Sequence, residues 1–116
     1  MNKTVLIVED EIRIRFLVRD YFKKEGFNVL EASDGEEALR IFSENIVDLA
    51  ILDIMMPKLD GLAVCRNIRE VSNTPIILLT AKSQEEDKLL GYELGADDYM
   101  TKPFSPKVLL AKAKHY

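Results

Sequence analysis

The chain has few of the residues from which redox and soft-metal sites are usually built. Its 116 residues include one cysteine, Cys65, one histidine and no tryptophan. A single cysteine excludes an internal disulfide and suits a reducing cytoplasm, where we expect the protein to act. One cysteine and one histidine also exclude a zinc site of the cysteine–histidine type.

Long apolar runs and a strong charge of one sign are absent as well. No apolar run approaches the roughly 20 residues that cross a bilayer, so no membrane segment is predicted. Acids and bases are interspersed around a net charge of −4, which does not favour nucleic-acid binding. The opening Asn2-Lys3-Thr4 has no signal-peptide pattern. The length predicts one domain over residues 1–116.

Strand-like and helix-like segments alternate along the chain. Three of the five expected strands are nearly continuous apolar runs, typical of parallel strands covered on both faces. The expected strands span residues 4–8, 27–31, 48–52, 75–79 and 98–101.

Helical periodicity fills the segments between these strands. The first helix is marked by apolar residues at helical spacing, namely Ile14, Leu17, Val18, Tyr21 and Phe22. Further helices are expected near residue 34, over 59–71 and 83–95, and from residue 105, the last of them clipped. The (βα)₅ order predicts an α/β, doubly wound, five-stranded parallel sheet with strand order 2-1-3-4-5.

Polar side chains follow the expected strands at the sheet edge where such folds bind ligands. Glu9 and Asp10 follow the first strand, Asp53 the third, Thr80 the fourth and Lys102 the fifth. Close carboxylates repel unless a proton or cation lies between them, and an all-oxygen cluster suits Mg²⁺, with Mn²⁺ as a substitute. An added ammonium and hydroxyl predict a phosphoryl site with Asp53 as the accepting nucleophile.

Each of these residues has a plainer interpretation when it is taken alone. Glu9 and Asp10 are compatible with the acidic first turn of a helix. Thr80 is compatible with an ordinary strand residue, Lys102 with a surface lysine and Tyr99 with an edge-strand aromatic. The phosphoryl-site prediction therefore depends on the combination.

Four motifs in order resemble the receiver domain of two-component response regulators. They are Asp10 after the first strand, LDIMMPKLDG at 52–61, LLTA at 78–81 and GADDYMTKPFSP at 95–106. The last motif is most similar to the winged-helix transcription-factor branch. The resemblance implies a regulatory phosphoacceptor that catalyses only its own phosphoryl transfer and dephosphorylation. It also implies a DNA-binding output domain outside this chain, while this domain itself binds no nucleic acid.

The resemblance implies a role for each residue of the site. A sensor histidine kinase would phosphorylate Asp53. Mg²⁺ would be held by Asp10, Asp53 and the backbone carbonyl of Met55, with Glu9 reaching it through water. Thr80 and Lys102 would bind the phosphoryl oxygens.

Neighbouring positions are implied to control access. The small Ala81 would leave room for the phosphoryl donor, and Met55 and Lys82 lie where they could modulate water access. Lys102-Pro103 would be a cis peptide, which proline permits.

The resemblance also implies a switch. Thr80 would move toward the phosphoryl group and Tyr99 would turn inward. This change would remodel the face formed by the helix over 83–95, the strand over 98–101 and the last helix.

Homodimerisation through that face is an open question. The family branch has Glu and Arg in its last helix, where this chain has Val108 and Lys112. Lys88, Asp97 and Asp98 match the rest of the charge set, but lysine lacks the bidentate fork of arginine.

Two interpretations of Ile12 and Phe16 also stay open. They lie one turn apart beside the acidic residues, either as a kinase-docking pair or as part of a wide core stripe. In the first case, Arg15 and Arg19 would influence partner choice through their charge.

Three other functions are less consistent with the sequence. A haloacid-dehalogenase-like phosphatase needs a second Asp where this chain has Met55. A flavodoxin-like carrier would meet repulsion between the flavin phosphate and the acids after the first strand. A degenerate receiver that acts only as a phosphorylation-independent interaction module remains the alternative.

Overall fold

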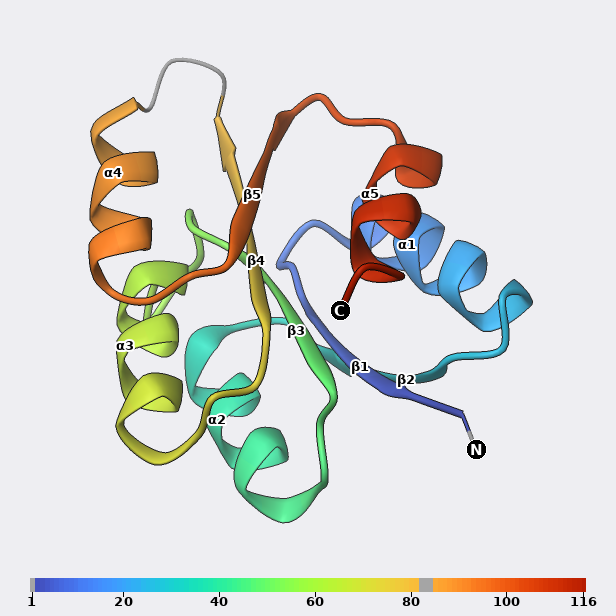
Figure 1. Cartoon of the computed structure of the whole chain (residues 1–116), viewed down its shortest axis with the longest axis horizontal. Coiled ribbons are helices and arrows are strands. Elements are labelled where there is room, and N and C mark those ends of the chain that lie inside the picture. The colour runs from blue at the N-terminus through green and yellow to red at the C-terminus, as the bar shows by residue number, and fades with distance from the viewer. Residues whose placement is uncertain (1, 82–84) are drawn as a thin grey trace.

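The structure is a computed structural model that describes residues 2–81 and 85–116. Within these residues, five strands alternate with five helices (Figure 1). The strands are β1 (Thr4–Val8), β2 (Asn28–Ala32), β3 (Leu49–Asp53), β4 (Ile76–Ala81) and β5 (Asp98–Lys102). The helices are α1 (Ile12–Lys24), α2 (Gly35–Glu44), α3 (Gly61–Val71), α4 (Glu85–Glu93) and α5 (Pro106–Ala113).

The strands form one parallel sheet in the order β2-β1-β3-β4-β5, which confirms the predicted fold. Helices α1 and α5 cover one face, and α2, α3 and α4 cover the other (Figure 1). The side chains of β1 point alternately to the two faces of the sheet, so this strand contributes to the hydrophobic core on both sides. Val5 and Ile7 pack with α1 and α5, whereas Leu6 and Val8 pack in the opposite layer.

Four strands end later than the sequence predicted, and for β3 and β4 the extension carries site residues. β3 includes Asp53, which lies opposite Leu79, and β4 includes Thr80 and Ala81, which lie opposite Thr101 and Lys102. The prediction ended both strands at their last apolar residue. Backbone pairing with neighbouring strands continues the ladder through polar residues, and this brings the functional side chains onto rigid strand ends.

Side-chain caps fix the starts of three helices. Asp34 accepts a hydrogen bond from the Glu37 N–H, and Asp60 accepts one from the Ala63 N–H, each at 2.8 Å. Ser105 caps α5 through the Val108 N–H. Because Asp60 is the cap, α3 begins at residue 61 rather than at 59. Ser83, where the fourth helix was expected to begin, lies outside the described residues.

The core stripe of α1 is narrower than the sequence predicted. Val18 and Phe22 are buried, but Leu17 is 49% exposed. Leu17 lies at the edge of the stripe, where it lines the groove between α1 and the segment that leads into α5. No helix among the described residues is long and apolar enough to cross a membrane.

Gly61 allows the loop after β3 to fold tightly against that strand. A Cβ atom at this position would lie 2.3 Å from the backbone oxygen of Asp53. The Gly61 N–H donates to the carbonyl of Ile54 at 3.0 Å. The absence of a side chain therefore lets α3 begin directly beside the end of β3.

Candidate functional site

Three acids converge at the carboxyl ends of adjacent strands. Glu9 and Asp10 follow β1, and Asp53 ends β3, which pairs with β1. One carboxylate oxygen from each lies within 4.8 Å of the others. Glu9 and Asp53 are buried, whereas Asp10 is exposed. The predicted convergence is confirmed.

Lys102 reaches this cluster from the end of β5. Its Nζ lies 2.6 Å from Oε1 of Glu9 and donates to Oδ2 of Asp53 at 3.1 Å. The Lys102-Pro103 peptide bond is cis, as the resemblance implied. One ammonium therefore bridges the two buried carboxylates.

The buried charges perturb one another. Burial raises the pKa of Glu9 to about 8, reinforced by the hydrogen bond and charge of Asp53 and opposed by Lys102. Burial alone would lower the pKa of Lys102, but its contacts with Glu9 and Asp53 outweigh that effect and raise this pKa. The cluster thus favours a bound proton or cation.

The donor set fits a hard divalent cation. Oε1 of Glu9 is buried and accepts no well-aligned hydrogen bond, although Lys102 lies beside it. Exposed Asp10 opens the cluster to water, and every candidate ligand is an oxygen. The Met55 N–H donates to Oδ1 of Asp53 at 3.3 Å, which holds the Met55 backbone beside that carboxylate. These residues could hold Mg²⁺.

Thr80 and Ala81 end the strand between those of Asp53 and Lys102. Thr80 is buried, and its hydroxyl donates to the Ala81 carbonyl at 3.4 Å rather than to Asp53. Ala81 is half-buried and lines a pocket of about 390 Å³ together with Lys102. Of the other two expected access residues, Met55 is exposed and Lys82 lies outside the described residues.

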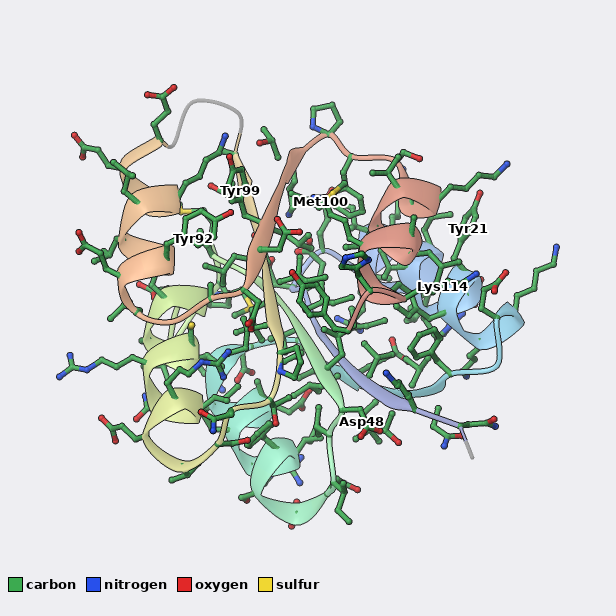
Figure 2. The ribbon with its side chains drawn as sticks, viewed as in Figure 1. Tyr21, Asp48, Tyr92, Tyr99, Met100 and Lys114 are labelled. Atoms are coloured by element: carbon green, nitrogen blue, oxygen red, sulfur yellow. The ribbon has the colours of Figure 1, made fainter. Side chains whose placement is uncertain are left out.

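Tyr99 is half-buried on β5 and packs toward α4. Its ring meets that of Tyr92 edge to face at a centroid distance of 5.5 Å, and Figure 2 shows the two rings side by side. Nζ of Lys88 lies 4.7 Å from the Tyr99 ring centroid. This cation–π contact gives the Lys88 ammonium a partner within its own chain. The switching role of Tyr99 stays a prediction.

The acids expected at the dimer face have partners within the chain. Asp98 pairs with Lys112 at 3.0 Å, and Val108 is exposed. Asp97 pairs with Arg69 at 2.7 Å and also accepts the Ile76 N–H.

Arg69 was not singled out by the sequence. Its guanidinium also donates to the carbonyls of Gly95 and Thr74. The one sequence feature that could have drawn attention to Arg69 is its position as a basic residue in the last turn of a helix.

The exposed face of α1 differs from the prediction at one residue. Ile12 and Phe16 are 56% and 40% exposed, which excludes the core-stripe interpretation. Arg19 lies over the Phe16 ring at 4.2 Å from its centroid. Arg15, expected as a surface charge, instead points inward and is bound to Glu31 and to the backbone of Glu9.

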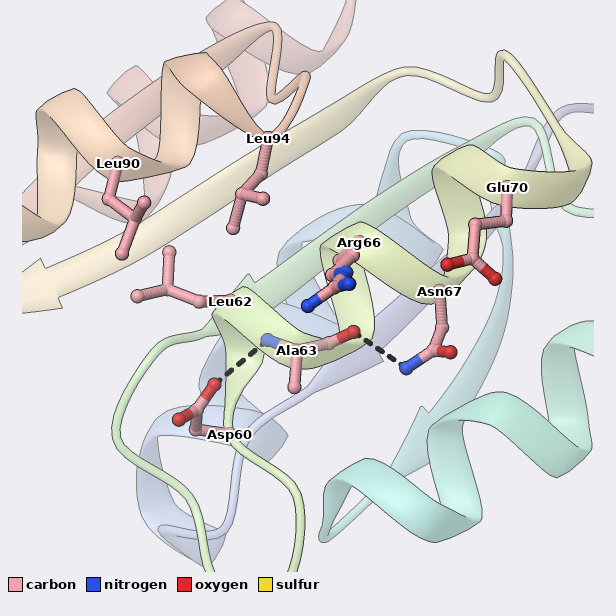
Figure 3. Close-up of a pocket in the computed structure, with 8 residues that line it drawn as sticks. All are labelled: Asp60, Leu62, Ala63, Arg66, Asn67, Glu70, Leu90 and Leu94. Carbon is pink, nitrogen blue, oxygen red and sulfur yellow. Dashed lines mark hydrogen bonds between the residues drawn. The ribbon is translucent and has the colours of Figure 1, made fainter.

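A larger pocket lies away from the acids, between α3 and α4 (Figure 3). Its volume is about 550 Å³, and Leu62, Leu90 and Leu94 form its apolar part. Two of its polar side chains, Asp60 and Asn67, make hydrogen bonds within α3. Among the described residues, the one group of three close acids is Glu9, Asp10 and Asp53, and none of these lines this pocket.

Comparison with known proteins agrees with this geometry. Residues 5–114 match the response regulator receiver domain family. The alkaline phosphatase synthesis transcriptional regulatory protein PhoP of Bacillus subtilis is 51% identical over 98% of this chain and 48% of its own length. The chain thus spans about half the length of such curated relatives.

Solved structures show the same fold. The Francisella response regulator 1452 receiver domain has a TM-score of 0.92 and 36% identity, covering 98% of this chain and 95% of its own. DrrB, a Thermotoga maritima OmpR/PhoB homolog, has a TM-score of 0.91 and 37% identity, covering 99% of this chain and 52% of its own. The chain belongs to the receiver domain family of two-component response regulators, and its relatives among transcriptional regulators fit the winged-helix branch of that family.

Proposed function

We propose that the chain is a phosphorylation-dependent switch in which Asp53 accepts a phosphoryl group from a sensor histidine kinase. The observation that supports this most directly is the convergence of Glu9, Asp10 and Asp53 with the ammonium of Lys102. Buried titratable groups with strongly shifted pKa values cluster at functional sites, and the pKa of Glu9 is shifted in this way. The arrangement suits a site that handles a cation and a phosphoryl group.

The residues of the chain orient the reaction. A carboxylate oxygen of Asp53 attacks phosphorus, the bond from phosphorus to the histidine nitrogen of the donor breaks, and that nitrogen keeps the electron pair. The Met55 N–H and the Lys102 ammonium hold the two oxygens of Asp53 and fix its rotamer. When bound by Glu9, Asp10, Asp53 and the Met55 carbonyl, Mg²⁺ would neutralise charge on the transferred group.

Thr80 and Tyr99 would carry the signal outward. The Thr80 hydroxyl makes one long hydrogen bond, so it can turn toward a phosphoryl oxygen at little cost. Its movement would leave space beside Tyr99, which lies half-buried on the adjacent strand. The face formed by α4, β5 and α5 would then change shape.

The whole protein would couple this switch to transcription. PhoP is a transcriptional regulatory protein of which the matched segment covers 48%, and the segment covers 52% of the DrrB chain. We therefore propose that residues 1–116 form one receiver domain and that an effector domain belongs to the natural protein.

The mass of the intact protein after incubation with acetyl phosphate tests the proposal. We expect one phosphoryl adduct on the wild type that requires Mg²⁺ and is lost in Asp53→Asn. Asp60→Asn is the matched control, because Asp60 is an exposed acid in the loop that follows Asp53 and asparagine can fill its capping role. An adduct that persists in Asp53→Asn would contradict the assignment. No adduct on the wild type would favour a degenerate receiver that acts through protein contacts alone.

A further inference from the structure

We propose that Arg15 is a positioning residue for the acidic cluster and sets its affinity for Mg²⁺. This inference rests on the proposed function. The Arg15 side chain is only 12% exposed, although it lies on the helix that also presents Ile12 and Phe16 to solvent. Its guanidinium points to the carboxyl ends of β1 and β2.

The guanidinium connects two elements of the site. Nη1 donates to the backbone carbonyl of Glu9 at 2.9 Å, and Nε donates to Oε1 of Glu31 at 3.1 Å. Glu31 belongs to β2, which pairs with β1 along its length. Arg15 therefore connects the loop after β1 to β2, a strand that cannot shift relative to β1.

The backbone of Glu9 is held on both sides. Its N–H donates to the Ala32 carbonyl at 3.1 Å, and its carbonyl accepts from Arg15. Oε2 of its side chain also accepts the Glu11 N–H at 3.2 Å. The peptide unit that Arg15 binds is the one that joins Glu9 to Asp10. Fixing its plane therefore fixes the directions from which both carboxylates approach the cluster.

Supporting contacts of this kind normally tune a metal site. Groups that orient the ligands from outside typically change metal affinity by about 10-fold to 100-fold when they are removed. Arginine suits this position because its planar fork donates from Nε and Nη1 in fixed directions. A lysine ammonium has no such fixed fork and would favour one acceptor over the other.

Arg69 provides a matched control for a merely structural role. It is also a half-buried arginine on a helix, and it also binds backbone carbonyls and one carboxylate. Its partners lie at the amino ends of β4 and β5, whereas the acids lie at the carboxyl ends of the strands. Arg69→Lys should weaken the fold without changing the affinity for Mg²⁺.

Mg²⁺ titrations followed by backbone amide NMR shifts test the inference. We expect the dissociation constant for Mg²⁺ to rise about tenfold in Arg15→Lys and to stay at the wild-type value in Arg69→Lys. Without metal, exchange of the Glu11 amide proton should be faster in Arg15→Lys and unchanged in Arg69→Lys. Glu31→Gln, which weakens the anchor of the guanidinium, should raise the dissociation constant in the same direction.

The outcomes separate this inference from the proposed function. Wild-type Mg²⁺ affinity in folded Arg15→Lys and Glu31→Gln would overturn the positioning role and leave the proposed function standing. An equal loss of affinity in Arg69→Lys would also overturn it, because general destabilisation would then explain the result. A wild-type protein that binds no Mg²⁺ would contradict both. If Arg15→Lys does not fold, the dissociation constant of Glu31→Gln for Mg²⁺ tests the positioning role by itself.

Discussion

The ammonium of Lys102 lies 2.6 Å from Oε1 of Glu9, so a residue at the end of the edge strand β5 contacts the residue that follows the inner strand β1. The same ammonium also binds Asp53. In the absence of metal, one positive charge thus faces two buried carboxylates. This imbalance has consequences for stability, because charges of one sign are hard to bury together.

The stability of the metal-free protein should depend on pH through Glu9. Its pKa is raised from 4.5 to about 8 in the folded state, mainly by burial. Between these values the folded protein binds more protons than the unfolded chain, so the free energy of unfolding should fall as pH rises from 4.5 to 8. Urea denaturation at several pH values in EDTA measures this trend.

Glu9→Gln is the control for this pH dependence, because glutamine keeps the shape of the side chain and does not titrate. The variant should show a flatter profile over the same window. An unchanged slope in Glu9→Gln would assign the effect to another group. Added Mg²⁺ should stabilise the wild type more strongly at pH 8 than at pH 5, since a metal ligand must be deprotonated.

Asp53→Asn should stabilise the metal-free protein. The substitution removes one of two neighbouring buried carboxylates and leaves Lys102 to pair with Glu9. We expect a gain of roughly 1 kcal/mol in the free energy of unfolding, as is common where a functional site is relieved of strain. Thermal unfolding in EDTA above pH 8, where the carboxyl group of Glu9 is ionised in the folded state, checks it. The gain should disappear when the comparison is repeated in saturating Mg²⁺, and a loss of stability in EDTA would contradict the argument.

Gly61→Ala should destabilise the fold strongly. The added Cβ would meet the backbone oxygen of Asp53 at 2.3 Å, and backbone atoms of β3 cannot move aside locally. We expect a loss of roughly 3 kcal/mol, at the upper end for overpacking. Gly26→Ala is the matched control: its φ of 92° is unfavourable for alanine, but no atom lies within 4 Å of the new Cβ. That variant should lose only about 1–2 kcal/mol, and equal losses would contradict the steric explanation.

The acidic site could be predicted from sequence because two separate features of the sequence point to its residues. Glu9, Asp10 and Asp53 each interrupt or end an apolar run, and the alternation of strands and helices predicts which strand ends meet. The strand limits were less accurate. Thr80 and Ala81 belong to β4 because β5 pairs with them, and a single sequence does not show where such pairing stops.

The roles of the two half-buried arginines could not be predicted in the same way. Arg15 and Arg69 occupy helix positions that are compatible with solvent exposure, and their carboxylate partners belong to other elements of the fold, 16 and 28 residues away in sequence. A long side chain can point to either side of its helix, so its contacts depend on tertiary geometry. The prediction therefore placed Arg15 on the docking face and overlooked Arg69.

The last helix leads to a prediction about self-association. Lys112 pairs with Asp98 of its own chain, and Val108 carries no charge, so neither of these α5 positions offers a free charge to a second copy. We expect the beryllofluoride-treated domain to dimerise weakly. The double variant Val108→Glu plus Lys112→Arg should dimerise at least about tenfold more tightly, since it supplies an acid and a bidentate cation.

Sedimentation velocity over a range of protein concentrations measures this difference. The matched control is Ala111→Glu plus Lys114→Arg, which makes the same changes of charge elsewhere on and just after α5. If both double variants dimerise equally, net charge rather than the geometry of the face would be responsible. A tight dimer of the wild type would contradict the prediction, because the face would then bind a second copy without the added acid and arginine.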